Sequence, residues 1–116
     1  YNAAEFRPAL IKDGEKSEDS FWTGEQPRAC FGTGDQGIYM LVIEGRYPDE
    51  GIRGTSVNTC SDILLAYGCR NALNMDGGSS AILWYDGEYV TQSSSSFLRY
   101  TGGRPLPNAW VYKKAE

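Results

Sequence analysis

The alternation of hydrophobic and polar residues predicts a strand near the start of the chain. Residues 8–12 (PALIK) form a short apolar run, and the pair Asp13-Gly14 that follows is typical of a tight turn. Residues 15–26 are mostly polar and predict an exposed loop.

Two longer strands are predicted next, at residues 28–32 (RACFG) and 38–44 (IYMLVIE). The glycine-containing residues 33–37 separate them, which indicates an antiparallel hairpin. The second strand is apolar on both faces, as expected of a central strand in a sheet.

After a loop rich in glycine, the hydrophobic period changes to that of a helix. The i, i+3, i+4, i+7 stripe consists of Cys60, Ile63, Leu64 and Tyr67. Thr59 with Asp62 three residues later resembles a capping box, so we expect Asp62 to cap the helix start. Gly68 is placed to end the helix in a left-handed conformation.

The remaining strands are predicted at residues 72–75, 81–85, 89–91 and 109–112, with a turn at residues 86–88. Neither a repeat nor a domain boundary is visible. The pattern therefore predicts one α+β domain over residues 1–116, with a mostly antiparallel sheet packed by one main helix.

Composition and charge exclude several function classes. The chain has 116 residues, of which 41% are hydrophobic, and a net charge of −4, which disfavours a nucleic-acid surface. No apolar run approaches the roughly 20 residues of a membrane span, and the first five residues do not resemble a signal peptide. The three cysteines favour buried thiols, with one disulfide plus a free thiol as the alternative.

Histidine is absent from the chain. This excludes a Ser-His-Asp or Cys-His catalytic site and any metal site that requires imidazole. The chemistry must come from carboxylates, hydroxyls, Arg, Lys and backbone amides.

Residues 76–80 combine a carboxylate with glycines and hydroxyls. Asp76 precedes Gly77 and Gly78, whose backbone can turn N–H groups toward an anion, and Ser79 and Ser80 add hydroxyl donors. This pattern predicts a phosphate cradle. The same letters between two apolar runs also describe an ordinary hairpin turn, and spacing alone favours that simpler interpretation.

Four arginines lie at loop or strand ends: Arg28, Arg46, Arg53 and Arg104. A guanidinium suits two phosphate oxygens, although any one of the four can equally be a solvated surface side chain. Arg28 is the best placed because it begins a strand. Asn74 and Asn108 adjoin apolar strand residues and are either structural anchors or site residues.

Several of these segments occur in the order seen in a known family. They are residues 27–32, 38–45, 54–55, 73–80 and 103–109. In this order the chain resembles the phosphodiester glycosidase domain family, whose members include the lysosomal uncovering enzyme, N-acetylglucosamine-1-phosphodiester alpha-N-acetylglucosaminidase, and bacterial exopolysaccharide-related proteins. Ala29 stands where the family usually has Thr.

The resemblance implies hydrolysis of a sugar-1-phosphodiester, which releases the sugar and leaves a phosphomonoester. It implies a small-molecule or glycan substrate and an extracellular, periplasmic or other secretory compartment. We expect no cofactor and assign no metal ligands, and the sequence leaves open whether a metal takes part. The family domain is usually longer, so the chain looks like its C-terminal part, with the N-terminal part as its partner.

The resemblance also assigns roles to single residues. Asp76 would act on the anomeric carbon, directly or through water, while Arg28 and Arg104 would hold the phosphate. The substrate-binding residues expected are Thr55, Asn74, Gly77, Gly78, Ser79, Ser80 and Asn108. A non-catalytic carbohydrate- or phosphate-binding module is the main alternative, and a purely structural domain is the second.

Overall fold

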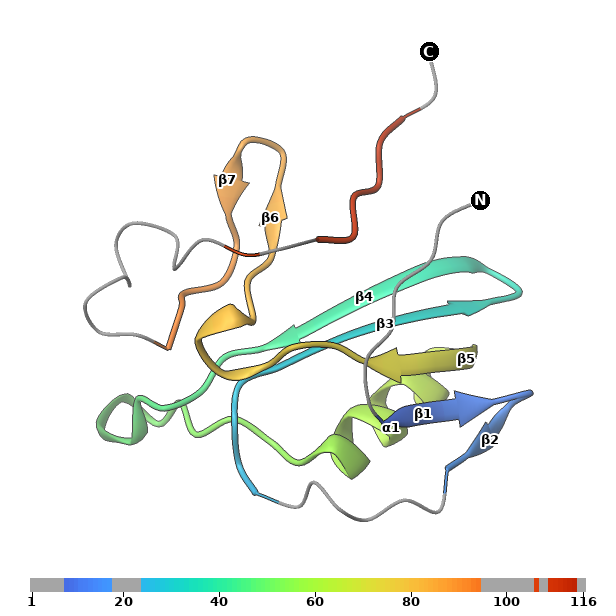
Figure 1. Ribbon diagram of the computed structural model, residues 1–116, viewed down its shortest axis with the longest axis horizontal. Helices are drawn as coiled ribbons and strands as arrows, with labels where there is room; N and C mark the ends of the chain where they lie inside the picture. The colour runs from blue at the N-terminus through green and yellow to red at the C-terminus, as the bar shows by residue number, and fades with distance from the viewer. Residues whose placement is uncertain (1–7, 18–23, 95–105, 107–108, 115–116) are drawn as a thin grey trace.

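The computed structural model describes residues 8–17, 24–94, 106 and 109–114. The fold is α+β, with a five-stranded sheet in the order β2-β1-β5-β3-β4 and antiparallel neighbours (Figure 1). The elements are β1 Ala9–Lys12, β2 Glu15–Lys16, β3 Arg28–Gly34, β4 Gly37–Ile43, the 3₁₀ turn η1 Pro48–Glu50, α1 Val57–Ala66, β5 Cys69–Asn74, the 3₁₀ turn η2 Gly78–Ser80, β6 Trp84–Tyr85 and β7 Glu88–Tyr89.

The predicted hairpin is confirmed, and its strands run further toward the turn than the sequence indicated. The β3–β4 register extends from Arg28 opposite Ile43 to Gly34 opposite Gly37. The prediction of a central position for β4 was wrong, because β4 lies at the edge of the five-stranded sheet. Apolar residues on both faces indicate that both faces are packed, and they carry no information about lateral neighbours.

The hydrophobic core lies between α1 and one face of the sheet. Its buried members are Leu10, Ile11, Cys30, Val57, Cys60, Leu64, Cys69 and Ala72. Because side chains alternate along a strand, Arg28 lies on the same face of β3 as Cys30, which places it under the helix side of the sheet. The core thus reaches the end of the sheet where β3 begins.

The helix exists as predicted, but a different residue caps it. Ser56 is the N-cap, and its hydroxyl accepts a 3.2 Å hydrogen bond from the Thr59 backbone N–H. Asp62 lies further along the helix and instead forms a 2.8 Å ion pair with Lys16. The expected capping box was wrong because the extended φ and ψ of the N-cap lie at Ser56. Gly68 has φ +92° after the helix end, as predicted.

Among the later strands, β5 is longer than predicted and β6 and β7 are shorter. The 72–75 prediction corresponds to β5, but only Trp84–Tyr85 of residues 81–85 and Glu88–Tyr89 around the turn are paired, as a separate hairpin (Figure 1). Residues 109–112 form no strand. Trp110 stacks on Phe31 with ring centroids 4.0 Å apart, whereas Val111 and Tyr112 are exposed.

Cys30, Cys60 and Cys69 are buried free thiols, in agreement with the favoured interpretation of the cysteines. Among the described residues, no helix has the length and apolar character needed to span a membrane.

Candidate functional site

The site forms where β3 begins and β5 ends. Asn74, the last residue of β5, lies opposite Cys30, and the chain then continues alongside β3. The Met75 N–H donates to the Ala29 carbonyl at 2.7 Å, and the Gly78 N–H donates to the Pro27 carbonyl at 3.0 Å. These bonds hold the Asp76-Gly77-Gly78 turn against the start of β3.

The two glycines allow this close approach. A Cβ on Gly77 would lie 2.6 Å from the Pro27 carbonyl oxygen, and Gly78 has φ +58°. The Ser80 N–H donates to the Gly77 carbonyl at 3.0 Å. The Gly78 amide, one of the two expected cradle amides, therefore already has a protein partner, and residues 78–80 form a 3₁₀ turn.

A second loop holds the turn from its outer side. The Ser93 hydroxyl donates to the Ser79 carbonyl at 3.2 Å, and Ser93 is buried. The Tyr47 hydroxyl in turn donates to the Ser93 carbonyl at 2.8 Å. Ser80 is buried and Ser79 half-buried, so the two hydroxyls differ in their access to solvent.

Arg28 lies beneath this end of the sheet and is only 6% exposed. Its Nε donates to the Thr55 carbonyl at 2.9 Å, and its Nη2 donates to the Gly24 carbonyl at 2.7 Å. Burial is the largest cause of a lowered pKa at Arg28. The guanidinium therefore ties the Thr55 loop to the start of β3 and adds a positive charge under the site.

Thr55 meets Gln26 in a two-way backbone bridge. The Gln26 N–H donates to the Thr55 carbonyl at 3.2 Å, and the Thr55 N–H donates to the Gln26 carbonyl at 3.0 Å. The Thr55 side chain is half-buried. The structure thus brings Thr55 next to Arg28.

Asn74 is buried on the helix side of the sheet, 3% exposed. Its Oδ1 is 4.0 Å from the Cys30 Sγ. A hydrogen bond with Cys60 and burial raise the pKa of Cys30, so this thiol stays protonated. Of the two roles left open for Asn74, its interior position favours that of an anchor for the end of β5.

Asp76 has an exposed side chain at the start of the turn. The structure thus brings together Arg28, Thr55, Asp76 and the 77–80 turn at one end of the sheet. Arg104 and Asn108 lie outside the described residues.

The fold and this site can be compared with known proteins. A family model described as phosphodiester glycosidase matches residues 1–113. The chain belongs to the phosphodiester glycosidase family. No curated protein matches the chain by sequence.

Two solved structures resemble this phosphodiester glycosidase chain. A hypothetical protein from Synechocystis has a TM-score of 0.61 and 28% identity, over 76% of this chain and 18% of that protein. The catalytic domain of zebrafish N-acetylglucosamine-1-phosphodiester alpha-N-acetylglucosaminidase, auto-inhibited by its pro-peptide, has a TM-score of 0.54 and 17% identity, over 74% of this chain and 33% of that one. The latter likeness shows the fold, and the chain spans at most a third of either structure.

The sequence analysis named Arg46 only as one of four arginines that could bind phosphate, and it assigned no role to Gln26 or Ser93. Arg46 lies beside Gly78, and its Nε donates to the Gln26 Oε1 at 2.8 Å. Its position between Gly45 and a tyrosine is the only sequence signal, and many surface arginines share such a context. Among the described residues, no three His, Cys, Asp or Glu side chains cluster in a way that suits a metal ion.

Proposed function

We propose that this phosphodiester glycosidase hydrolyses a sugar-1-phosphodiester, releasing the sugar and leaving a phosphomonoester. The observation that carries the proposal is the position of Asp76 on a glycine turn packed against the start of β3, above the buried Arg28. Membership of the family supplies the reaction class. The relative named for N-acetylglucosamine-1-phosphodiesters suggests the first substrates to try.

In the proposed reaction the bond between the anomeric carbon and the phosphate oxygen breaks, and the phosphate leaves with the electron pair. A new bond forms from the anomeric carbon to the oxygen of water, whose proton is released. Asp76 acts either as the base that takes this proton or as the nucleophile, which water then displaces. A phosphate is a stable anion on leaving, so a second carboxylic acid matters less than in most glycosidases.

The other residues of the proposed site bind and orient. In this proposal the positive charges of Arg28 and Arg104 attract the phosphate. The turn that contains Gly77 and Gly78 forms the floor of the site. The hydroxyls of Ser79 and Ser80 act as donors in this proposal. Thr55 and Asn108 orient the substrate, and Asn74 fixes the strand end that carries Asp76.

The chain acts, in this proposal, as the C-terminal part of a longer phosphodiester glycosidase domain whose N-terminal part completes the site. The chain spans 18% and 33% of the two solved structures, which supports its being one part of a longer domain. An extracellular, periplasmic or other secretory location and an exopolysaccharide-related substrate follow from the family resemblance and belong to the same proposal.

The test is Asp76→Asn in the full-length protein, assayed with N-acetylglucosamine-1-phosphodiesters. We expect kcat to fall by about 10²- to 10⁴-fold with the melting temperature unchanged. Asp86→Asn is the matched control, because Asp86 lies in the exposed turn of the β6–β7 hairpin and has φ +50°, which Asn tolerates. Near-normal turnover by Asp76→Asn would remove Asp76 from the chemistry, and substrate binding without turnover by the unaltered protein would favour a binding module.

A further inference from the structure

Arg46 extends its guanidinium over the glycine turn. A Cβ built on Gly78 would lie 3.1 Å from Nη2, 3.2 Å from Nη1 and 3.4 Å from Cζ of Arg46. Three such similar distances show that the outer end of the guanidinium, and not one nitrogen alone, faces Gly78. The missing side chain at Gly78 leaves room for this contact.

The backbone of Arg46 is held in an unfavourable conformation. Its φ is +66°, in the left-handed region that non-glycine residues rarely adopt. Both neighbours are fixed: a Cβ on Gly45 would lie 2.9 Å from the Pro27 nitrogen, and Tyr47 exchanges two backbone hydrogen bonds with Ile52. Strain that the surrounding structure imposes on a residue is a feature of functional positions.

One side of the guanidinium is anchored and the other is left for a ligand. Nε of Arg46 donates to the Gln26 Oε1 at 2.8 Å, and Gln26 is itself fixed by its backbone bridge to Thr55. The terminal nitrogens Nη1 and Nη2 therefore project over the turn in a defined direction. This pair matches the spacing of two phosphate oxygens.

Arg46 also adds a second positive charge beside Arg28. Burial is the main cause of the lowered pKa of Arg28, and the charge of Arg46 contributes in the same direction. In the described part of the chain, ion pairing is confined to Lys16 and Asp62, so neither guanidinium has a carboxylate partner there. Two neighbouring cations raise the local positive potential and so favour the binding of an anion.

We propose that Arg46 is the exposed phosphate-binding residue of the site and that its guanidinium binds the substrate phosphate above Gly78. Arg28, whose Nε and Nη2 bind backbone carbonyls, acts from below as a positioning residue and a source of charge. The identity of the ligand as a phosphodiester rests on the proposed function, whereas the anion site itself rests on the geometry.

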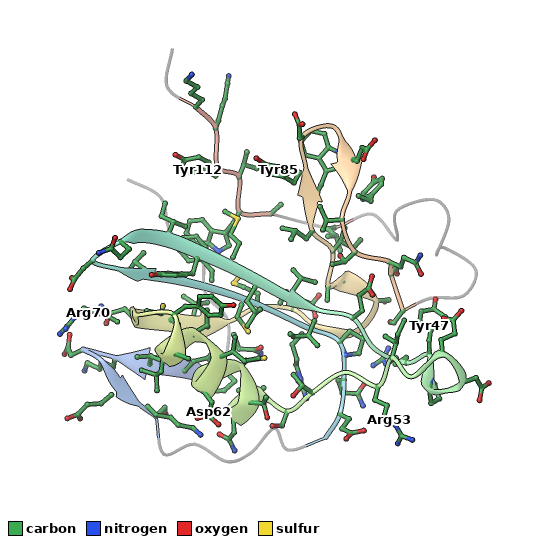
Figure 2. All side chains as sticks on the ribbon, turned by 180° about the vertical axis from the view of Figure 1, so that it is seen from behind. Tyr47, Arg53, Asp62, Arg70, Tyr85 and Tyr112 are labelled. Atoms are coloured by element: carbon green, nitrogen blue, oxygen red, sulfur yellow. The ribbon has the colours of Figure 1, made fainter. Side chains whose placement is uncertain are left out.

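The experiment is a calorimetric titration of inorganic phosphate into the full-length protein at low ionic strength. We expect Arg46→Gln to weaken phosphate binding by at least about ten-fold, and Arg46→Lys to recover part of it because the charge returns without the planar fork. Arg53→Gln is the matched control, since Arg53 is an exposed arginine on the same loop (Figure 2). It should bind phosphate as the unaltered protein does.

Arg46→Asn separates binding from folding, because Asn tolerates a left-handed backbone. We expect its melting temperature to stay within about 2 °C of the unaltered protein while its phosphate affinity falls as in Arg46→Gln. Phosphate binding by Arg46→Gln within two-fold of the unaltered protein, or no phosphate binding by the unaltered protein, would overturn the proposal. Asp76→Asn should still bind phosphate, so lost catalysis and lost anion binding are distinguishable.

Discussion

The hydroxyl of Tyr47 donates a 2.8 Å hydrogen bond to the carbonyl of Ser93, which joins the loop after β4 to the loop after β7. The Ser93 hydroxyl in turn donates to the Ser79 carbonyl, which connects this loop to the glycine turn. Figure 2 shows Tyr47 and Arg53 on one side of the molecule, away from Tyr85, Tyr112 and Arg70. The turn is therefore fixed from two sides, by β3 and by this loop.

Removing the Tyr47 hydroxyl should destabilise this connection. We expect Tyr47→Phe to lower the free energy of unfolding by about 1 kcal/mol, because the Ser93 carbonyl loses a donor. Urea unfolding measures the change. Tyr67→Phe is the control, since Tyr67 is 71% exposed, and its substitution should have almost no effect. Equal values for the two variants would show that the bond adds nothing to stability.

Arg28 should tolerate replacement by lysine poorly. Its Nε and Nη2 donate to two different carbonyls, and a single ammonium on a flexible stem cannot reproduce that fork. We expect Arg28→Lys to lose about 2 to 3 kcal/mol of unfolding free energy. Chemical denaturation of Arg28→Lys beside Arg53→Lys checks this, because Arg53 is exposed and the second change should be nearly neutral.

Two substitutions test whether Ser56, as in the structure, or Asp62, as the sequence pattern predicted, caps the helix. Ser56→Ala removes the acceptor of the Thr59 N–H and should destabilise the protein by about 1 kcal/mol. Asp62→Asn breaks only the exposed pair with Lys16 and should cost less than about 0.5 kcal/mol. Thermal unfolding of both variants tests the assignment, and the reverse order would restore Asp62 as the capping residue.

The buried thiol of Cys69 should make the protein less stable as the pH becomes alkaline. Burial raises the pKa of this thiol above its ordinary value, and its Sγ lies 3.3 Å from the Asn71 carbonyl and 3.4 Å from the Thr33 carbonyl. As the pH rises, the Cys69 thiol loses its proton in the unfolded chain before it does so in the folded protein. Its contribution to the free energy of unfolding is therefore complete below about pH 8.5 and is lost as the pH rises further.

The measurement is the free energy of unfolding between about pH 8 and pH 10 for the unaltered protein and Cys69→Ala. We expect a shallower decline in Cys69→Ala, since one of the thiols that ionise preferentially in the unfolded state is gone. The comparison concerns the slope and not the absolute stability, which the loss of a buried side chain also lowers. Parallel curves would contradict the assignment.

Local patterns predicted the elements whose formation depends on neighbouring residues. The β3–β4 hairpin followed from two apolar runs around a glycine-containing turn, and α1 followed from its apolar stripe and from Gly68. Residues 109–112 had the same strand-like composition but form no strand, because a strand also needs a partner with free backbone groups. Composition cannot supply that partner.

The arrangement of the site was predictable only in part. The resemblance selected Asp76 and the glycine turn, and the structure brings that turn to Arg28 through the pairing of β5 with β3. The approach of Arg46 to Gly78 depends on a left-handed backbone between two packed neighbours. Contacts of this kind join segments more than thirty residues apart and leave no local signal in the sequence.

The stack of Trp110 on Phe31 has a practical consequence. Residues 109–114 belong to no strand, so the position of Trp110 depends on ring contact and not on a backbone ladder. Phe31 faces away from α1, on the side of the sheet that the core does not use. In a variant with Trp22 and Trp84 replaced by Phe, the indole emission of Trp110 should therefore report whether residues 109–114 are docked on that face.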